Sequence, residues 1–172
     1  MQMTRINRAI STSAAVILAI TAFSAAPAFA DGSGSRSDSL LDAQLVGSMP
    51  APASPMIAGI NPGGVPWVNG PSRVQVSEDG QIMVDIRGLV IPPPRGKGVN
   101  PIASVVATLV CDQMVAGSTA PFALSSAGNG STSGMISVPR HCDDPVVLIQ
   151  PAANQSVYIA STVGDDEEGS DA

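Results

Sequence analysis

Several groups that could carry out chemistry lie together in one short stretch, RHCDDP at residues 140–145. It contains the only histidine of the sequence, one of its two cysteines and two adjacent carboxylates. The other cysteine, Cys111, is also followed by an acid, Asp112. Residues of these types can bind a metal ion, form a thiol nucleophile with a histidine base, or supply one half of a disulfide.

The first thirty residues have the order of a secretory signal peptide. Arg5 and Arg8 precede an apolar run centred on residues 14–23, and small residues lead up to Ala30. The apolar run is shorter than the roughly 20 residues of a membrane-spanning helix, so residues 1–30 predict a cleaved signal rather than an anchor. We therefore expect a secreted or cell-envelope protein with no membrane span after cleavage.

Export decides between the chemistries open to the two cysteines. A cysteine pair in an oxidising compartment is far more often a disulfide than a metal site, which predicts a bridge between Cys111 and Cys142. Tetrahedral zinc needs about four ligands, and the bridge would leave His141 as the only one among the Cys and His residues. The bridge would also leave no free thiolate for catalysis. We therefore expect no cofactor. Closing a loop of this length with a disulfide should raise the free energy of unfolding by about 3.5 kcal/mol.

The acids beside the cysteines suggest one metal hypothesis. A disulfide holds the Cα atoms of its cysteines within about 7 Å, which would bring Asp112, Asp143 and Asp144 near one another. Calcium prefers hard oxygen ligands of this kind. The sequence therefore predicts a shallow calcium site, and solvated loop acids are the alternative.

Other catalytic arrangements find little support in the residue pattern. A Ser-His-Asp triad would have to use His141, and no serine stands in a Gly-x-Ser-x-Gly turn. We expect His141 to be a surface residue beside the bridge. A hydrolase that uses carboxylates near Asp112 and Asp143 stays open as an alternative.

The charge of the chain argues against nucleic acid as a partner. Cleavage of residues 1–30, which carry Arg5 and Arg8, leaves six basic and fourteen acidic residues, a net charge of −8. Binding to phosphate backbones needs a cluster of Lys and Arg. We therefore expect no nucleic-acid binding.

Composition divides the rest of the chain into three parts. Residues 31–64 are rich in Ser, Gly, Pro and Ala, which predicts a disordered, flexible linker. Within it, residues 40–46 predict a nascent helical turn, or a segment that docks on a partner. Residues 65–164 have the length of one small domain, and residues 165–172 form an acidic tail with five of the fourteen acids.

Within residues 65–164 the apolar period is two, the pattern of half-buried antiparallel strands. It predicts a hairpin of residues 73–77 and 81–87, joined by a three-residue loop that ends on Gly80, where positive φ is needed. Pairing across this loop places the apolar residues on one face: Val76 opposite Ile82 and Val74 opposite Val84.

Further short apolar runs predict more strands, separated by stretches rich in Pro and Gly. They lie at residues 67–68, 104–111, 122–126, 135–138, 146–150 and 157–163. No segment shows a sustained helical stripe. The sequence thus predicts an all-β fold, an immunoglobulin-like β-sandwich of about seven or eight short antiparallel strands, in preference to a jelly roll or closed barrel.

Four segments together resemble a group of small uncharacterised secreted bacterial β-sandwich proteins. They are VPWVNGPSRVQVSEDGQIMVDIRGLV, TLVCD, SVPRHCDDPVVLIQP and VYIASTVG. That resemblance implies a fold and no activity. The stretch DGQIMVDIRGL is also similar to the immunoglobulin-like apoproteins that carry enediyne chromophores, whose additional cysteine pair this chain lacks.

These observations favour an exported, non-enzymatic binding or structural protein that uses its loops. Its partner would be an extracellular protein, a polysaccharide or a small molecule. The carboxylate-dependent hydrolase is one alternative. A small-ligand carrier with an apolar slot between the sheets is another.

Overall fold

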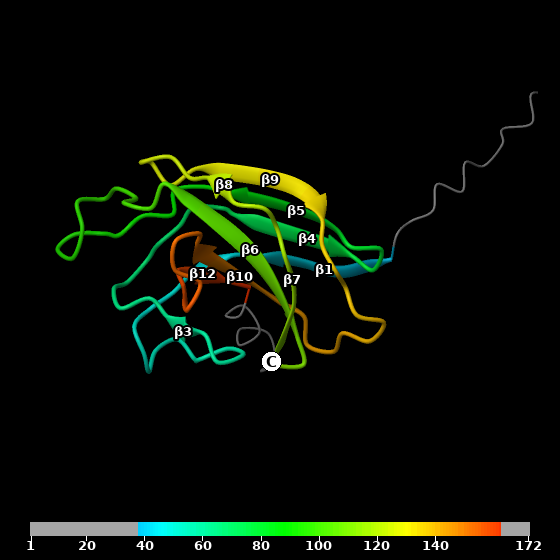
Figure 1. The fold of residues 1–172 in the computed structure, drawn as a ribbon. Coiled ribbons are helices and arrows are strands. Elements are labelled where there is room, and N and C mark those ends of the chain that lie inside the picture. The colour runs from blue at the N-terminus through cyan, green and yellow to red at the C-terminus, as the bar shows by residue number, and fades with distance from the viewer. Residues whose placement is uncertain (1–37, 163–172) are drawn as a thin grey trace, which may run out of the picture. The chain divides into compact units, whose positions relative to one another are not determined.

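The computed structural model describes residues 38–162, and every regular element in that range is a strand (Figure 1). The all-β prediction is therefore confirmed. The predicted signal peptide, residues 1–30, and the predicted acidic tail, residues 165–172, lie outside the described residues.

Two antiparallel sheets form the main layers of this unit (Figure 1). The four-stranded sheet, called sheet A here, has the order β1 (Ser39–Gln44), β4 (Arg73–Ser77), β5 (Gln81–Ile86) and β9 (Gly130–Met135). The six-stranded sheet, sheet B, has the order β2 (Val46–Gly47), β12 (Ala160–Ser161), β10 (Val146–Pro151), β6 (Ser104–Cys111) and β7 (Met114–Ser118), with β8 (Phe122–Ala123) also pairing with β6. A small third sheet pairs β3 (Asn61–Pro62) with β11 (Val157–Tyr158) in parallel.

The inward faces of sheets A and B share one hydrophobic core in a sandwich-like arrangement. Alternate residues of a strand point to opposite faces, so each strand places every second residue in the core. The core residues of the four central strands are Val74, Val76, Ile82, Val84 and Ile86 from sheet A and Val105, Ala107, Leu109, Val147 and Ile149 from sheet B. All of them are almost completely buried.

The predicted hairpin has the predicted register. Val76 pairs with Ile82 and Val74 with Val84, and Gly80 has a φ of 92°. A residue with a side chain would be strained at that φ. Local turn chemistry and burial thus agree in this part of sheet A.

The segment before residue 65 is folded from residue 38 onward, which corrects the prediction of a flexible linker over residues 31–64. The predicted helical turn at 40–46 is wrong as well, because β1 lies there and pairs with β4. The chain then crosses at the buried Leu45 from sheet A to sheet B, where β2 pairs with β12.

The rest of this segment covers the outer face of sheet B. Strands β6 and β10 are mostly apolar and are buried on both faces, so something must cover the face that lies away from sheet A. Ile57 and Ile60 pack there in a second apolar cluster with Val110, Leu148 and Tyr158. The Tyr158 hydroxyl donates a hydrogen bond of 2.6 Å to the Pro55 carbonyl, which holds this covering segment against sheet B.

Two smaller strand predictions also need correction, and one strand was missed. The predicted strand at residues 135–138 is wrong in position, because β9 ends at Met135, and β7 at Met114–Ser118 was not predicted. Strand β9 is rich in Gly and Ser and forms because it pairs along β5. Trp67 is buried in the core, and Val68 makes only a single bridge, to Val90.

Candidate functional site

The outer face of sheet A is a polar surface that several strands assemble. In β4 and β5 the residues between the core positions point outward, and they are polar except for Met83. The register places Arg73 opposite Asp85, and Asp85 opposite Ser131. One strand pair therefore carries side chains of opposite charge next to a row of hydroxyls on β9.

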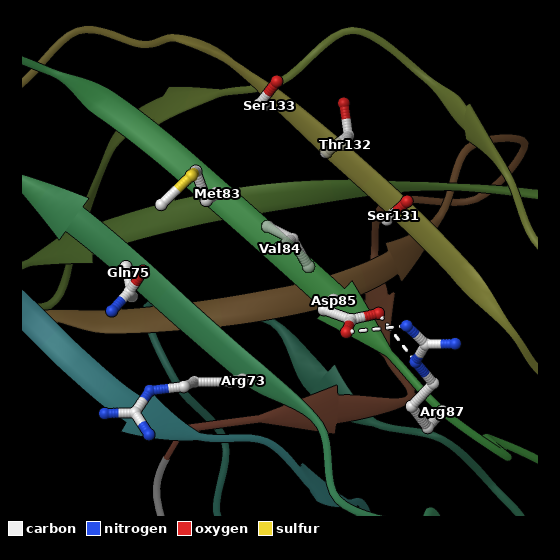
Figure 2. Close-up of a pocket in the computed structure, with 9 residues that line it drawn as sticks. All are labelled: Arg73, Gln75, Met83, Val84, Asp85, Arg87, Ser131, Thr132 and Ser133. Atoms are coloured by element: carbon white, nitrogen blue, oxygen red, sulfur yellow. Dashed lines mark hydrogen bonds and ion pairs between the residues drawn. The ribbon is translucent and has the colours of Figure 1, made fainter.

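These outward residues line a depression of about 730 Å³ (Figure 2). Its lining combines Arg73, Gln75, Met83, Val84, Asp85 and Arg87 with Ser131, Thr132 and Ser133. Val84 belongs to the core set of β5, so it contributes mainly the floor of the depression. The volume falls in the range of roughly 300–1,000 Å³ that is usual for ligand sites.

Both arginines of the depression are held by carboxylates through two contacts each. Arg73 donates to the two carboxylate oxygens of Asp42 at 2.6 and 2.7 Å, and Gln75 donates to the same carboxylate at 3.2 Å. Arg87 approaches the two oxygens of Asp85 at 2.9 and 3.0 Å, as Figure 2 shows. Two-point contacts of this kind fix the plane of a guanidinium group.

The Arg73 contact also changes acidity. Hydrogen bonding from Arg73, and then from Gln75, lowers the pKa of Asp42 below its ordinary value, and Asp42 raises the pKa of Arg73. The pair therefore stays ionised over the whole physiological pH range. The outer face of sheet A thus presents fixed donors and acceptors whose charges balance.

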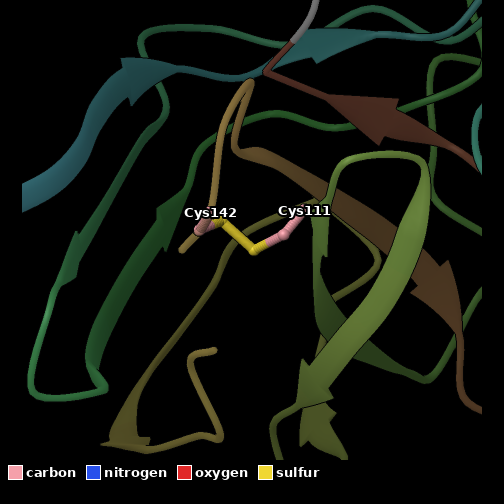
Figure 3. The surroundings of a disulfide bond; sticks show 2 residues. All are labelled: Cys111 and Cys142. Carbon is pink, nitrogen blue, oxygen red and sulfur yellow. A yellow bond between two sulfur atoms is a disulfide. The ribbon is translucent and has the colours of Figure 1, made fainter. Parts of the chain in front are cut away.

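The second candidate region is the predicted disulfide, which the structure confirms (Figure 3). Cys111 ends β6, Cys142 lies in the connection between β9 and β10, and their Cα atoms are 4.8 Å apart. Cys111 is buried on the core side of β6, as its strand parity predicts. The Asp112 N–H donates to the Asp143 carbonyl at 3.2 Å, so the two flanking backbones also meet.

The structure does not gather the three predicted calcium ligands into a site. Asp112, Asp143 and Asp144 are exposed, and among residues 38–162 no three His, Cys, Asp or Glu side chains are grouped so that they could hold a metal ion. A disulfide constrains the Cα atoms of its cysteines and leaves the neighbouring side chains free to diverge. The calcium hypothesis therefore receives no support from the geometry.

His141 is exposed beside the bridge, where the sequence placed it. It lines two pockets, which also share Val138 and Pro139 of the connection that carries Cys142. Neither of these pockets includes a serine together with a carboxylate and His141 in hydrogen-bonded order. A triad on His141 therefore has no geometric basis among their residues.

Sequence reasoning did not identify the outer face of sheet A as a site. The signal was present in the alternation of β5, where polar residues and Met83 share the face opposite to the core. The sequence could not show that Asp42 and the serines of β9 lie beside that face. Asp42 belongs to a segment that was predicted to be a linker, and the strand β9 was not predicted at these serines.

Comparison with protein-family models, with curated proteins and with solved structures found no match to this chain. The fold and the bridge alone therefore define its class, an all-β protein whose two main sheets are antiparallel and which contains one disulfide. No helix among the described residues is long and apolar enough to cross a membrane. The resemblances drawn from the sequence stay predictions.

Proposed function

We propose that this chain is an exported, non-enzymatic binding protein with an immunoglobulin-like scaffold, and that the outer face of sheet A binds a neutral, hydroxyl-rich ligand such as a polysaccharide. The observation that carries the proposal is the depression on that face, where Arg87 pairs with Asp85 inside the lining and Arg73 pairs with Asp42 of the neighbouring strand β1. A buried disulfide is compatible with an extracellular location.

The balance of charge favours a neutral ligand. An anionic ligand at either arginine would be repelled by the carboxylate of Asp42 or Asp85 beside it, and a cationic ligand would be repelled by the arginine. A sugar hydroxyl can donate to a carboxylate lone pair and accept from a remaining guanidinium N–H without breaking either pair. Ser131 and Ser133 add further hydroxyl groups at the edge of the depression.

The strands beneath the depression favour binding as well. The core residues of β4 and β5 are almost completely buried, so the backbone that carries the polar groups is well packed. Met83 has 47% of its surface exposed in the middle of this face. It offers an apolar contact to the C–H side of a sugar ring.

The two alternatives are less well supported. A carrier needs an apolar slot between the sheets, whereas the inward side chains of both sheets pack into one cluster with almost no exposed area. A carboxylate-dependent hydrolase would use Asp112 and Asp143, and no pocket described above is lined by both of these acids.

The test is a binding titration of the purified, oxidised protein against soluble neutral polysaccharides and anionic ones. We expect saturable binding to at least one neutral polysaccharide. Arg87→Gln should weaken it by about tenfold, the loss of hydrogen bonds from a charged donor. Arg95→Gln removes the same charge outside the depression and is the matched control.

Two results would contradict the proposal. One is the lack of saturable binding to every neutral polysaccharide tested. The other is an equal loss of affinity in the Arg87 and Arg95 variants, because binding would then follow net charge rather than the outer face of sheet A.

A further inference from the structure

A smaller pocket of about 340 Å³ opens beside the disulfide, away from the depression on sheet A. One wall is the start of β7, with Met114 and Val115, and the other is the connection after β9, with Val138 and Pro139. Cys111 contributes to its inner end. The pocket is therefore bounded by apolar side chains and the bridge.

A close approach of two backbones delimits this pocket. A Cβ atom built on Gly117 of β7 would lie 2.7 Å from the Ser137 carbonyl oxygen and 2.8 Å from the Ser137 nitrogen. Only glycine permits this approach without displacing one chain. The two walls of the pocket therefore lie in close contact at Gly117 and Ser137.

The walls expose more apolar surface than the fold requires. Met114 has 69% and Val115 has 55% of its surface exposed, two of the highest values among the large apolar residues of the described range. Apolar residues gathered in an exposed hollow commonly mark a binding site. An apolar group of a ligand would cover both side chains.

The charge around this pocket is negative. Asp112 lies in its lining, and the adjoining pocket of about 490 Å³ adds Glu78 and Asp143 against a single positive residue, Arg140. His141 lines both pockets. A ligand that complements these apolar walls and acidic residues carries a positive group next to its apolar part.

We propose that the pocket beside the disulfide binds a small amphipathic cation, a compound with an apolar body and one ammonium group. The apolar body lies between Met114, Val115 and Val138. The ammonium group lies against the Asp112 carboxylate. This site is independent of the polysaccharide proposal, because its lining comes from β7 and the connection after β9 rather than from the outer face of sheet A.

The probe is benzylamine, titrated into the oxidised full-length protein and followed by amide chemical shifts. Benzyl alcohol and benzoate serve as the neutral and anionic analogues of the same size. We expect saturable shifts confined to residues 111–117 and 137–143, with affinity in the order benzylamine, benzyl alcohol, benzoate.

Two matched variants test the role of charge. Asp112 and Asp144 both lie beside the disulfide, both are exposed, and both have positive φ values, 51° and 48°. Asparagine tolerates this conformation as well as aspartate does, so Asp112→Asn and Asp144→Asn should fold alike. Asp112→Asn should weaken benzylamine binding about three- to fivefold, as expected for an exposed ion pair, and Asp144→Asn should leave it unchanged.

A third variant tests the apolar wall. Val115→Ser should weaken benzylamine and benzyl alcohol by the same factor, because it removes apolar contact and leaves the carboxylate in place. The proposal is overturned if benzylamine gives no saturable shifts at these residues, if benzoate binds as well as benzylamine, or if the Asp144 variant loses as much affinity as the Asp112 variant.

Discussion

At the scale of single residues, Tyr158 shows how burial controls a titrating group. It is the only tyrosine of the chain, and it is fully buried beneath the segment that covers sheet B. Burial raises the pKa of its phenol above the ordinary value of 10, and a hydrogen bond with Ser54 offsets part of this effect. The neutral phenol is therefore the form that the fold accommodates.

We expect the stability of the protein to fall as pH rises through the raised pKa of Tyr158. In the unfolded chain the phenol ionises near pH 10, whereas in the folded chain it ionises higher. Between these two values the unfolded state has released a proton that the folded state still holds, so a rise in pH favours unfolding. Ultraviolet absorbance of the tyrosinate ion measures the pKa of Tyr158 directly, because no other tyrosine contributes.

The variant Tyr158→Phe provides the control. It should lower the free energy of unfolding at neutral pH by about 1–2 kcal/mol, because the Pro55 carbonyl loses its donor. It should also abolish the part of the alkaline loss that belongs to Tyr158. A native pKa equal to that of the unfolded chain would contradict the burial argument.

At the scale of elements, the turn before β9 depends on Gly128. This residue has a φ of 75°, and its carbonyl accepts a hydrogen bond of 3.0 Å from the Leu89 N–H. A Cβ atom at Gly128 would collide with the backbone of Leu89. The position of the start of β9 depends on this contact. The serines of β9 that line the depression on sheet A therefore depend on it as well.

Replacing each of two glycines with alanine separates the stability cost of a strained backbone from the cost of a steric clash. Gly128→Ala should lower the free energy of unfolding by more than about 2 kcal/mol, because it combines strain with a clash. Gly59 has a similar φ of 78° and nothing within 4 Å of its Cβ position, so Gly59→Ala should cost only about 1 kcal/mol. Denaturant titrations of both variants make the comparison, and equal losses would contradict it.

At the scale of the whole molecule, the disulfide links β6 of sheet B to the connection that leaves β9 of sheet A. Its cysteines are 31 positions apart in the sequence. Few aromatic residues contribute to the core, since aromatics make up 3% of the chain. The bridge therefore supplies a substantial part of the marginal stability expected for a domain of this size.

Reduction of the bridge should lower the free energy of unfolding by about 3.5 kcal/mol in the chain-entropy model. Trp67, the only tryptophan and a buried core residue, reports unfolding by its fluorescence in denaturant. A variant with Cys111→Ala and Cys142→Ala should behave like the reduced protein and be insensitive to reductant. An unchanged midpoint after complete reduction would show that the bridge does not stabilise this fold.

The sequence by itself determined the features that depend on nearby residues or on simple counting. The register of the β4–β5 hairpin follows from one loop and the alternation beside it, and the cysteine pairing follows from there being two cysteines. The strand β6 was predicted with its observed bounds because its residues are mostly apolar and β-branched. The exposed position of His141 followed from the lack of partners for it.

Only the tertiary structure decided how the remaining segments fold. Residues of β1, β9 and the cover of sheet B are mostly small or polar and have weak local preference, so their conformation comes from pairing with β4 and β5 and from burial against Val110 and Leu148. The outer face of sheet A is a consequence of the same pairing. Its depression exists because β9, distant in sequence, places Ser131 beside the Arg73 and Asp85 of the β4–β5 hairpin, which no local pattern encodes.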